Sequence, residues 1–457
     1  MLVTLVLAYF LAPEDFGLVA MMTVFLAIAN ALMDSGFKQA LIRIKNARQA
    51  DFNTGFFANL VLSLLAYVLL FISAPLIAGF YEQPQLVELI RIAALSVIIN
   101  AFQVVHLARL SREMNFKAQF KAALPASAMS AVVAVTMAYF GYGVWALVGQ
   151  MLAASFFITL LLTLQSRWRP SREVSLASLG GMYSFGYKLF LSALLDTVFK
   201  NLYVIVIAKL FSASVAGLYF FADRIREIVV FQLVFAIQNV TFPALATLQD
   251  DNGRLKAGFR NVIAVTTFLL FPVMVFLAAL AEPLFHLLLP EKWWTSASYL
   301  QLMCLAGLLV PLHAINLNIL QVKGRSDLFL LLEVIKKTML VVILLISYRF
   351  GVIGILIGQI VSSVLAYLPN SYFSKRLIDY SLREQLADFL PGLLVAVVIG
   401  LGMFYLQARL DWHELVTLLV LGGTGIVLYL LVTHVFGLQA SQLSRNMLLL
   451  RLKGKNV

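Results

Sequence analysis

The feature that most constrains this chain is a series of apolar runs, each about twenty residues long, that recurs along the whole sequence. A helix needs about 20 such residues to cross a bilayer. Membrane-spanning segments are helices or closed barrels, and barrel strands alternate over about ten residues instead of running continuously. Only 12% of the 457 residues are charged, about half the soluble average. The sequence therefore predicts an all-α integral membrane protein and excludes a soluble globular enzyme.

We expect about 14 transmembrane helices: two bundles of six and two more at the C-terminal end. The expected spans lie near residues 1–12, 16–32, 55–80, 89–108, 122–140 and 144–164, then 183–208, 216–235, 262–281, 298–320, 329–348 and 352–373, and finally 389–406 and 415–436. This predicts an N-terminal bundle over residues 1–165, a cytoplasmic linker over 166–182, a C-terminal bundle over 183–376, and two extra helices with a basic tail over 377–457.

The chain opens inside apolar sequence, so its first span has only about twelve residues, too few to cross about 30 Å at 1.5 Å per residue. We therefore expect that the first helix is truncated or that the start codon is misassigned. No basic segment precedes it, which argues against a signal peptide.

The distribution of basic residues predicts the orientation of the chain in the membrane, because cytoplasmic loops carry the excess of lysine and arginine. Most of the 34 basic residues lie in alternate connecting segments and in the C-terminal tail, whereas the opposite side holds Arg91, Lys209, Lys292, Arg349 and Arg409. The tail is expected in the cytoplasm. The net charge of +12 follows from this topology, so no nucleic acid is expected as a partner.

Short matches indicate that the two bundles are copies of one unit. Ala8 and Gly17-Leu18 recur as Ala208 and Gly217-Leu218, Pro75-Leu76 recurs as Pro283-Leu284, and Gly149-Gln150 recurs as Gly358-Gln359. Two copies with six spans each share one orientation, which predicts a pseudo-two-fold axis along the membrane normal. Chance matching among apolar helices is the alternative.

Charged side chains inside the expected spans are the candidate site residues. A charge at mid-span costs at least about 2.5 kcal/mol on insertion scales, so it is expected to face a wet cavity or a partner. The cations are Lys188, Lys200, Arg224, Arg226, Lys336 and Lys337, and the carboxylates are Asp196, Asp223, Glu227 and Glu333. The surplus of cations suits an anion, and arginine suits phosphate.

Ion pairing within each helix is the alternative for these charges, since Asp196 with Lys200 and Glu333 with Lys337 have the four-residue spacing of neighbours on a helix. Uncharged groups leave a similar choice open. Asn100, Gln103, His106, His313, Asn316 and Gln321 can hydrogen-bond sugar hydroxyls or join helix to helix. Gly354 and Gly358 have the spacing that permits close helix packing.

The sequence lacks the motifs of several kinds of catalytic and metal site. There is no G-x-x-x-x-G-K-[ST] loop for ATP, no H-E-x-x-H or cysteine pair for a metal, and no G-x-S-x-G nucleophile elbow. The single cysteine, Cys304, cannot form an intrachain disulfide. We expect no enzyme activity, no cofactor and no metal, which leaves transport.

Five segments resemble a known family: FLAPEDFGLVAM (10–21), DSGFKQALI (34–42), GYGVWALVGQ (141–150), FADRIRE (221–227) and FPALATLQDD (242–251). They are similar to the polysaccharide transporter branch of the multidrug/oligosaccharidyl-lipid/polysaccharide exporter superfamily, the Wzx-type oligosaccharide flippases of lipopolysaccharide biosynthesis. The resemblance extends from about residue 10 to the twelfth span and, more loosely, through the last two.

The resemblance implies a flippase of the bacterial inner membrane. It would move an undecaprenyl-pyrophosphate-linked oligosaccharide to the periplasmic leaflet by alternating access, with a polysaccharide polymerase and a chain-length regulator as further partners. A cationic cavity would receive the pyrophosphate, and its candidates from the charge argument are Lys188, Lys200, Arg224, Arg226 and Lys336. Coupling carboxylates would be sought among Asp196, Asp223, Glu227 and Glu333. A drug or cation antiporter of the same superfamily and a non-transporting scaffold are the alternatives.

Overall fold

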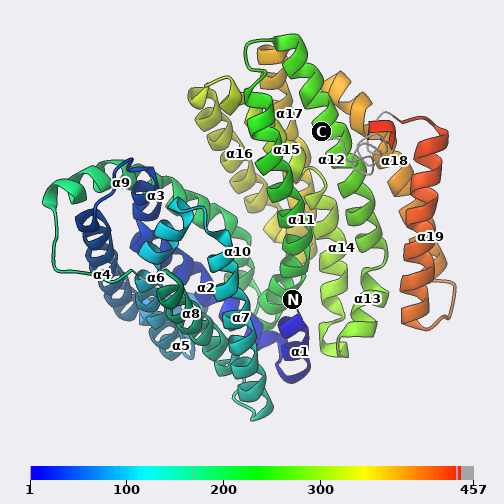
Figure 1. Cartoon of the computed structure of the whole chain (residues 1–457). Coiled ribbons are helices and arrows are strands. Elements are labelled where there is room, and N and C mark those ends of the chain that lie inside the picture. Colours follow the sequence, from blue (N-terminus) through cyan, green and yellow to red (C-terminus); the bar gives the residue numbers. More distant parts are fainter. Residues whose placement is uncertain (1, 167, 439–440, 444–457) are drawn as a thin grey trace. The chain divides into compact units, whose positions relative to one another are not determined.

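A computed structural model describes residues 2–166, 168–438 and 441–443 of the chain (Figure 1). Within these residues all regular elements are helices, nineteen α-helices and two short 3-10 helices. The predicted all-α fold class is confirmed.

Two compact units divide the chain, Met1–Phe220 and Phe221–Val457. The first unit holds α1 (Leu2–Phe10), α2 (Pro13–Asp34), α3 (Phe37–Arg43), α4 (Gln49–Tyr81), α5 (Leu86–Ala93), α6 (Leu95–Arg112), α7 (Phe116–Tyr139), α8 (Trp145–Ser166), α9 (Leu176–Lys200), α10 (Leu202–Leu210) and the start of α11 (Ala213–Ala246). The predicted domain boundaries stay predictions.

The second unit begins inside α11 and contains the remaining helices. These are α12 (Asn252–Ala279), α13 (Ala281–Leu288), η1 (Glu291–Trp293), α14 (Thr295–Gly307), α15 (Val310–Val322), α16 (Ser326–Ser347), η2 (Tyr348–Phe350), α17 (Gly351–Ile378), α18 (Leu382–Gln407) and α19 (Glu414–Val435).

Ten helical stretches among the described residues are long and apolar enough to cross a membrane, or eleven if the bent pair α9/α10 is one span. One of these stretches, Asp327–Ile378, has 52 residues. As one straight helix at 1.5 Å per residue it would be about 78 Å long, which is more than twice the hydrocarbon thickness of about 30 Å. It consists of α16 and α17 packed against each other, so its length suffices for two crossings. The predicted count of 14 stays a prediction.

Polar residues at the helix ends explain where several spans begin. The Asp15 carboxylate accepts a hydrogen bond from the Ala12 backbone N–H at 2.8 Å, and Asp51 accepts one from the Arg48 N–H at 2.7 Å. These bonds satisfy donors that the first turn of a helix leaves without a partner. The α2–α3 turn places Ser35 and Gly36 at positive φ, 38° and 73°, a conformation that glycine adopts without a steric cost.

Several spans are interrupted. α9 and α10 meet at a 43° bend. α14 ends at Gly307 and α15 begins at Val310. Pro311 stands at the start of α15, where its missing N–H removes no hydrogen bond that the helix needs. The tenth predicted span is therefore a broken helix.

The internal repeat is visible in the helix boundaries. α1 and α10, and likewise the starts of α2 and α11, lie 200 residues apart. A Cβ atom added to Gly149 would lie 2.3 Å from Met137 Sδ on the preceding helix, and one added to Gly358 would lie 2.6 Å from Ser347 Oγ. Equivalent glycines thus permit equivalent close packing, α7 with α8 and α16 with α17. The predicted packing role of Gly358 is confirmed.

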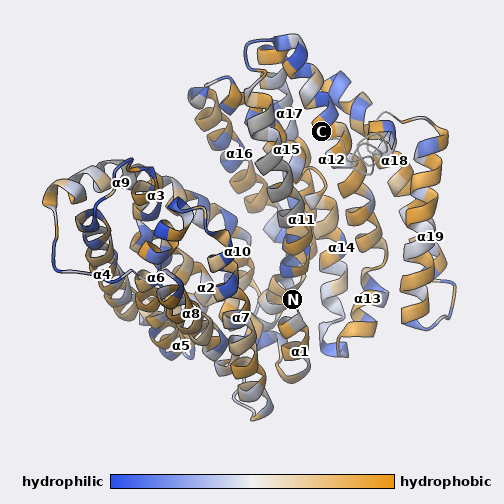
Figure 2. Cartoon of the chain, in the orientation of Figure 1, coloured by the Kyte–Doolittle hydropathy of each residue, from blue (hydrophilic) through white to orange (hydrophobic). Residues whose placement is uncertain are grey.

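Apolar residues dominate the long helices, and hydrophilic residues gather at their ends and in the turns (Figure 2). Large hydrophobic side chains face outward on several helices, among them Val61 and Val132, each 66% exposed, and Leu76, 75% exposed. Side chains of this kind suit hydrocarbon surroundings. Inside the first unit, Phe37, Phe56, Trp168 and Met182 share a buried core that joins α3, α4, the segment after α8, and α9.

Candidate functional site

The charged cluster on α11 consists of two ion pairs. Arg226 contacts the Asp223 carboxylate at 2.6 Å, and Arg224 contacts Glu227 at 3.3 Å. The Arg226–Asp223 side chains are about a quarter exposed, whereas those of Arg224 and Glu227 are more than half exposed. Both pairs have the three-residue spacing of neighbours on a helix.

On α9, the Lys200 ammonium contacts the Asp196 carboxylate at 3.0 Å. The ion pair expected from their four-residue spacing is therefore present, and it is exposed at the end of the helix. Lys188, the other candidate on α9, has a side chain that lies outside the described residues.

On α16, Glu333 pairs with Lys336, three residues further along the helix. The expected pair of Glu333 with Lys337 stays a prediction. Side chains three and four residues apart are both neighbours of a helical residue, so spacing alone does not decide between the two lysines.

Arg226 and Lys336 each lie near one part of the broken helix formed by α14 and α15 in the second unit. Arg226 Cδ is 3.7 Å from the point where a Cβ on Gly307 would sit, at the end of α14. Lys336 acts electrostatically on His313 of α15. The five candidate cations, however, divide between the two compact units, with Lys188 and Lys200 in the first and Arg224, Arg226 and Lys336 in the second. Their role as a cationic surface stays a prediction.

His313 begins a buried polar network inside the second unit. Its Nδ1 lies 2.8 Å from Asn370 Nδ2, and its Nε2 lies 3.5 Å from Ser363 Oγ, both on α17. One turn along α15, Asn316 donates to Gln385 of α18 at 3.3 Å and accepts from Ser374 at 2.7 Å. Asn316 therefore joins three helices, which favours the helix-to-helix interpretation over sugar binding for this residue.

A similar network in the first unit joins α2 and α6. Asn100 donates to Asn30 at 3.0 Å, and Gln103 donates to Asn100 at 3.0 Å. His106 contacts Ser166 at the end of α8 and packs edge-on against Trp168. These contacts again join helices.

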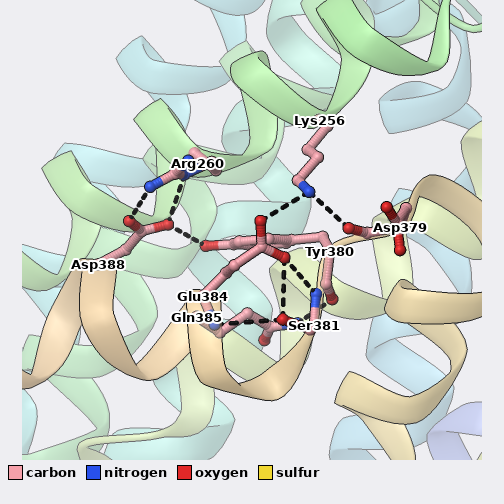
Figure 3. Close-up of polar contacts among 8 residues, drawn as sticks. All are labelled: Lys256, Arg260, Asp379, Tyr380, Ser381, Glu384, Gln385 and Asp388. Atoms are coloured by element: carbon pink, nitrogen blue, oxygen red, sulfur yellow. Dashed lines mark hydrogen bonds and ion pairs between the residues drawn. The ribbon is translucent and has the colours of Figure 1, made fainter.

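Sequence reasoning missed a cluster of charges where α12 meets α18 (Figure 3). Arg260 donates two hydrogen bonds to the Asp388 carboxylate, at 2.8 and 2.6 Å, and Tyr380 donates a third to the same carboxylate at 2.7 Å. Lys256 contacts Glu384 at 2.7 Å. We call these five residues the α12–α18 clamp. Burial and the neighbouring Asp388 raise the pKa of the Tyr380 hydroxyl, so Tyr380 stays a donor at neutral pH.

The α12–α18 clamp makes α18 an integral part of the second unit. Asp388 has a side chain that is only 6% exposed, and a buried carboxylate needs the paired donors that Arg260 and Tyr380 supply. The sequence does contain an indication of the α12–α18 clamp, because Asp388 stands at the edge of an apolar run. The expected span begins at residue 389 and leaves Asp388 outside.

Comparison with solved structures identifies the fold of this protein. The chain matches the lipid II flippase MurJ in an inward closed conformation with a TM-score of 0.75 and 14% identity over 95% of both chains. It also matches an inward-facing multidrug resistance MATE family transporter of the MOP superfamily, with a TM-score of 0.64 and 17% identity over 83% of this chain and 96% of that one. The chain therefore has the fold of this class of multi-span membrane transporters.

Residues 6–298 match the model of a family described as polysaccharide biosynthesis protein. The chain belongs to this family. It is 26% identical to the lipopolysaccharide biosynthesis protein WzxC of Escherichia coli over 87% of this chain and 83% of that protein. The teichuronic acid biosynthesis protein TuaB of Bacillus subtilis is 27% identical, and the succinoglycan biosynthesis transport protein ExoT of Rhizobium meliloti is 28% identical. Those two alignments cover 66% and 67% of this chain and 62% of each relative.

The family and the fold explain what several family-like segments do. In FLAPEDFGLVAM, Asp15 caps α2, and in DSGFKQALI the Ser35-Gly36 turn joins α2 to α3. In FADRIRE, the charges form the two pairs on α11. The side chains of Phe242, Pro243 and Ala244, within FPALATLQDD, lie outside the described residues.

Proposed function

We propose that this chain is a flippase that moves an undecaprenyl-pyrophosphate-linked oligosaccharide from the cytoplasmic to the periplasmic leaflet by alternating access. The observation that carries the proposal is the family match over residues 6–298, with relatives named for lipopolysaccharide, teichuronic acid and succinoglycan biosynthesis. The fold shared with a lipid II flippase supports it. The activity makes and breaks no covalent bond, so it requires no catalytic residue, cofactor or metal.

The ion pairs support a mechanism in which the pyrophosphate of the substrate displaces a carboxylate from its paired cation. We call it the exchange mechanism. Arg224–Glu227 and Lys200–Asp196 are exposed pairs on single helices, and such pairs contribute only about 0.3 to 0.5 kcal/mol. A pyrophosphate offers several acceptor oxygens and more charge than one carboxylate, so it can displace Glu227 or Asp196 from its cation at small cost. The carboxylates released in this way, together with Asp223 and Glu333, are the candidate groups for coupling to an ion.

The orientation rests on the distribution of basic residues. Lys38, Arg43, Lys45 and Arg48 stand between α2 and the first turn of α4, and the C-terminal tail is also basic. The excess of basic residues on cytoplasmic loops supports a cytoplasmic C-terminus in a bacterial inner membrane. A polysaccharide polymerase and a chain-length regulator are the proposed protein partners, because a repeat unit delivered to the periplasmic leaflet must be polymerised there.

A drug or cation antiporter is the second candidate function, and the fold shared with a multidrug resistance transporter favours it. A binding site for organic cations would be net negative or aromatic. The candidate charges inside the expected spans are six cations and only four carboxylates, and this surplus of cations supports an anionic substrate instead.

The test is reconstitution of the full chain in vesicles with a fluorescent prenyl-pyrophosphate saccharide. Leaflet exchange is scored by chemical quenching of the outer leaflet, with and without an ion gradient. We expect exchange with the wild-type chain and reduced exchange with Lys336→Gln, while the exposed Thr338→Ala on the same helix serves as the matched control. Absence of exchange by the wild-type chain, with export of a cationic dye instead, would support the antiporter.

A further inference from the structure

His313 is a titratable side chain of the second unit to which the exchange mechanism assigns no role. It stands on α15 and its ring faces α17, with Nδ1 2.8 Å from Asn370 Nδ2 and Nε2 3.5 Å from Ser363 Oγ. The Tyr367 ring packs edge-on against it, with the two ring centroids 5.9 Å apart. Histidine is the side chain that most readily gains or loses a proton near neutral pH, so its hydrogen-bond partners decide which protonation states it can adopt here.

Both hydrogen-bond partners of the ring can serve the neutral and the protonated form. A neutral imidazole has one donor and one acceptor nitrogen, whereas the protonated ring has two donors. Asn370 Nδ2 only donates, so His313 Nδ1 is the acceptor in the structure. Asn370 Oδ1 is buried and has no hydrogen-bond partner among the residues that the structure describes. A half turn of this amide presents Oδ1 to a protonated Nδ1, while the Ser363 hydroxyl accepts from Nε2–H in both forms, so protonation leaves neither ring nitrogen without a partner.

The hairpin of α15 and α16 places Lys336 beside His313. The two helices pack against each other and are joined by residues 323–325 alone, so they run in opposite directions. Leu317 of α15 and Leu332 of α16 belong to one hydrophobic cluster. One helical turn further along the hairpin, four residues before Leu317 and four after Leu332, stand His313 and Lys336. The charge of Lys336 accordingly acts on His313.

The other titratable groups on the helices packed against α15 divide into a near and a far set. The near set is Glu333, which pairs with Lys336, Lys337 on the same helix, and the Tyr367 hydroxyl, which donates to Gln385 of α18. The charged residues of the far set stand in the first turns of α12 and α16 and in the last turn of α17. These are Arg254, Lys256, Arg260, Asp327, Lys375 and Arg376. The charges that change beside the ring when a substrate binds are therefore those of α16.

We propose that His313 binds a proton together with the anion that pairs with Lys336. A pyrophosphate carries more negative charge than the Glu333 carboxylate that it displaces, so the surroundings of the ring become more negative and favour the protonated form. The coupling is reciprocal, because a proton on His313 adds a second positive charge beside Lys336 and strengthens binding of the anion by the same factor. The inference rests on the proposed function and adds to it a group that couples binding of the lipid to pH.

The test is titration calorimetry of the full chain in detergent with a short-chain prenyl-pyrophosphate saccharide. Each phosphorus of such a diester is already ionised and does not titrate near neutral pH, so a proton that is taken up is bound by the protein. Titrations in buffers with different ionisation enthalpies, at pH values from about 5 to 8, give the number of protons taken up with each anion. We expect the wild-type chain to take up as much as about one proton. Binding without uptake at every pH would overturn the proposal.

Three variants assign the proton to a residue. His313→Gln introduces an amide that can still hydrogen-bond Asn370, and it should abolish the uptake. His286→Gln is the matched control, because His286 belongs to the same unit but lies 3.3 Å from a carboxylate, that of Glu414; this change should leave the uptake unchanged. Glu333→Gln removes the rival proton acceptor, the carboxylate that the anion releases. Uptake that is lost in Glu333→Gln and kept in His313→Gln would overturn the proposal.

The pH dependence of binding by the wild-type chain needs no variant at His313. Where a whole proton is taken up with the anion, the affinity should fall about tenfold for each rise of one pH unit, the equivalent of about 1.4 kcal/mol. An affinity that stays constant from about pH 5 to 8 would contradict the coupling.

These outcomes separate His313 from the proposed function. If the wild-type chain binds the probe with uptake of a proton but moves no saccharide between leaflets, the flippase proposal fails and the proton site stands. If the wild-type chain moves the saccharide and binds it without uptake of a proton, only the His313 proposal fails.

Discussion

Gly17 on α2 and Gly217 on α11 face each other inside the first unit, 200 residues apart in the sequence. A Cβ atom added to Gly17 would lie 1.8 Å from the Ala213 carbonyl oxygen, and one added to Gly217 would lie 1.7 Å from the Pro13 carbonyl oxygen. Pro13 and Ala213 are themselves 200 residues apart. The contact is thus reciprocal, as contacts across a local two-fold are, and glycine at both positions is what lets the two backbones approach.

Gly17→Ala and Gly217→Ala should each destabilise the protein, because a methyl group at either position overlaps backbone atoms that cannot rotate away. Overpacking costs about 1 to 3 kcal/mol, and we expect the upper end here. The measurement is the thermal unfolding midpoint of the purified protein in detergent. Gly402 on α18 is the control, since a Cβ there would meet nothing within 4 Å. Gly402→Ala should stabilise by up to about 1 kcal/mol through helix propensity, and equal destabilisation by all three changes would contradict the close approach.

The bidentate contact between Arg260 and Asp388 should be the strongest single polar link between α12 and α18. Removing one partner of a buried ion pair costs about 3 to 5 kcal/mol. Arg260 is 38% exposed, so we expect a smaller loss of about 2 to 3 kcal/mol for Arg260→Gln after discounting for solvent screening. Asp388→Asn should cost less than Arg260→Gln, because the amide that it introduces can still accept from Tyr380.

The matched control for this pair is Arg325→Gln. Arg325 contacts Asp327 at 2.6 Å in an exposed turn, so it has similar geometry without burial. Its removal should leave the unfolding midpoint unchanged. A midpoint for Arg260→Gln as high as that of the wild-type chain would show that the α12–α18 clamp adds nothing to the stability of the second unit.

The sequence predicts well where the helices lie and poorly which of their side chains form pairs, for a physical reason. Apolarity over twenty residues is a local property, so each expected span falls on a helix or on a consecutive pair of helices. Pairing depends on rotamers and on distant segments. Glu333 could reach Lys336 or Lys337 at nearly equal cost, and Arg260 meets Asp388 across 128 residues of sequence.

Substitutions of Glu333 and Lys336 test whether exchange also occurs at this less exposed pair, because they should change binding in opposite directions. Glu333→Gln removes the carboxylate that occupies the Lys336 ammonium, so a prenyl pyrophosphate no longer has to displace it. We expect tighter binding for Glu333→Gln. Lys336→Gln should weaken binding about tenfold, the equivalent of losing one hydrogen bond to a charged group at about 1.5 kcal/mol. Titration calorimetry of the detergent-solubilised protein with a short-chain prenyl pyrophosphate measures both. Equal weakening by the two changes would mean that Glu333 positions Lys336 instead of competing for it.

The ion pair between Glu82 and Lys209 should make one contact of the first unit dependent on pH. Lys209 Nζ lies 2.8 Å from Glu82 Oε1, between the end of α10 and the residue after α4. The hydrogen bond and charge of Lys209 lower the pKa of Glu82. A carboxylate with a lowered folded-state pKa contributes stability above its unfolded pKa of about 4.3 and loses it as the pH falls through the folded value. The unfolding midpoint of the wild-type chain should therefore drop more steeply below pH 4.3 than that of Glu82→Gln, and the two curves should converge at the acid end. Glu82 is exposed, so high salt should shrink the difference; parallel curves at low salt would show that the pair does not couple α4 to α10.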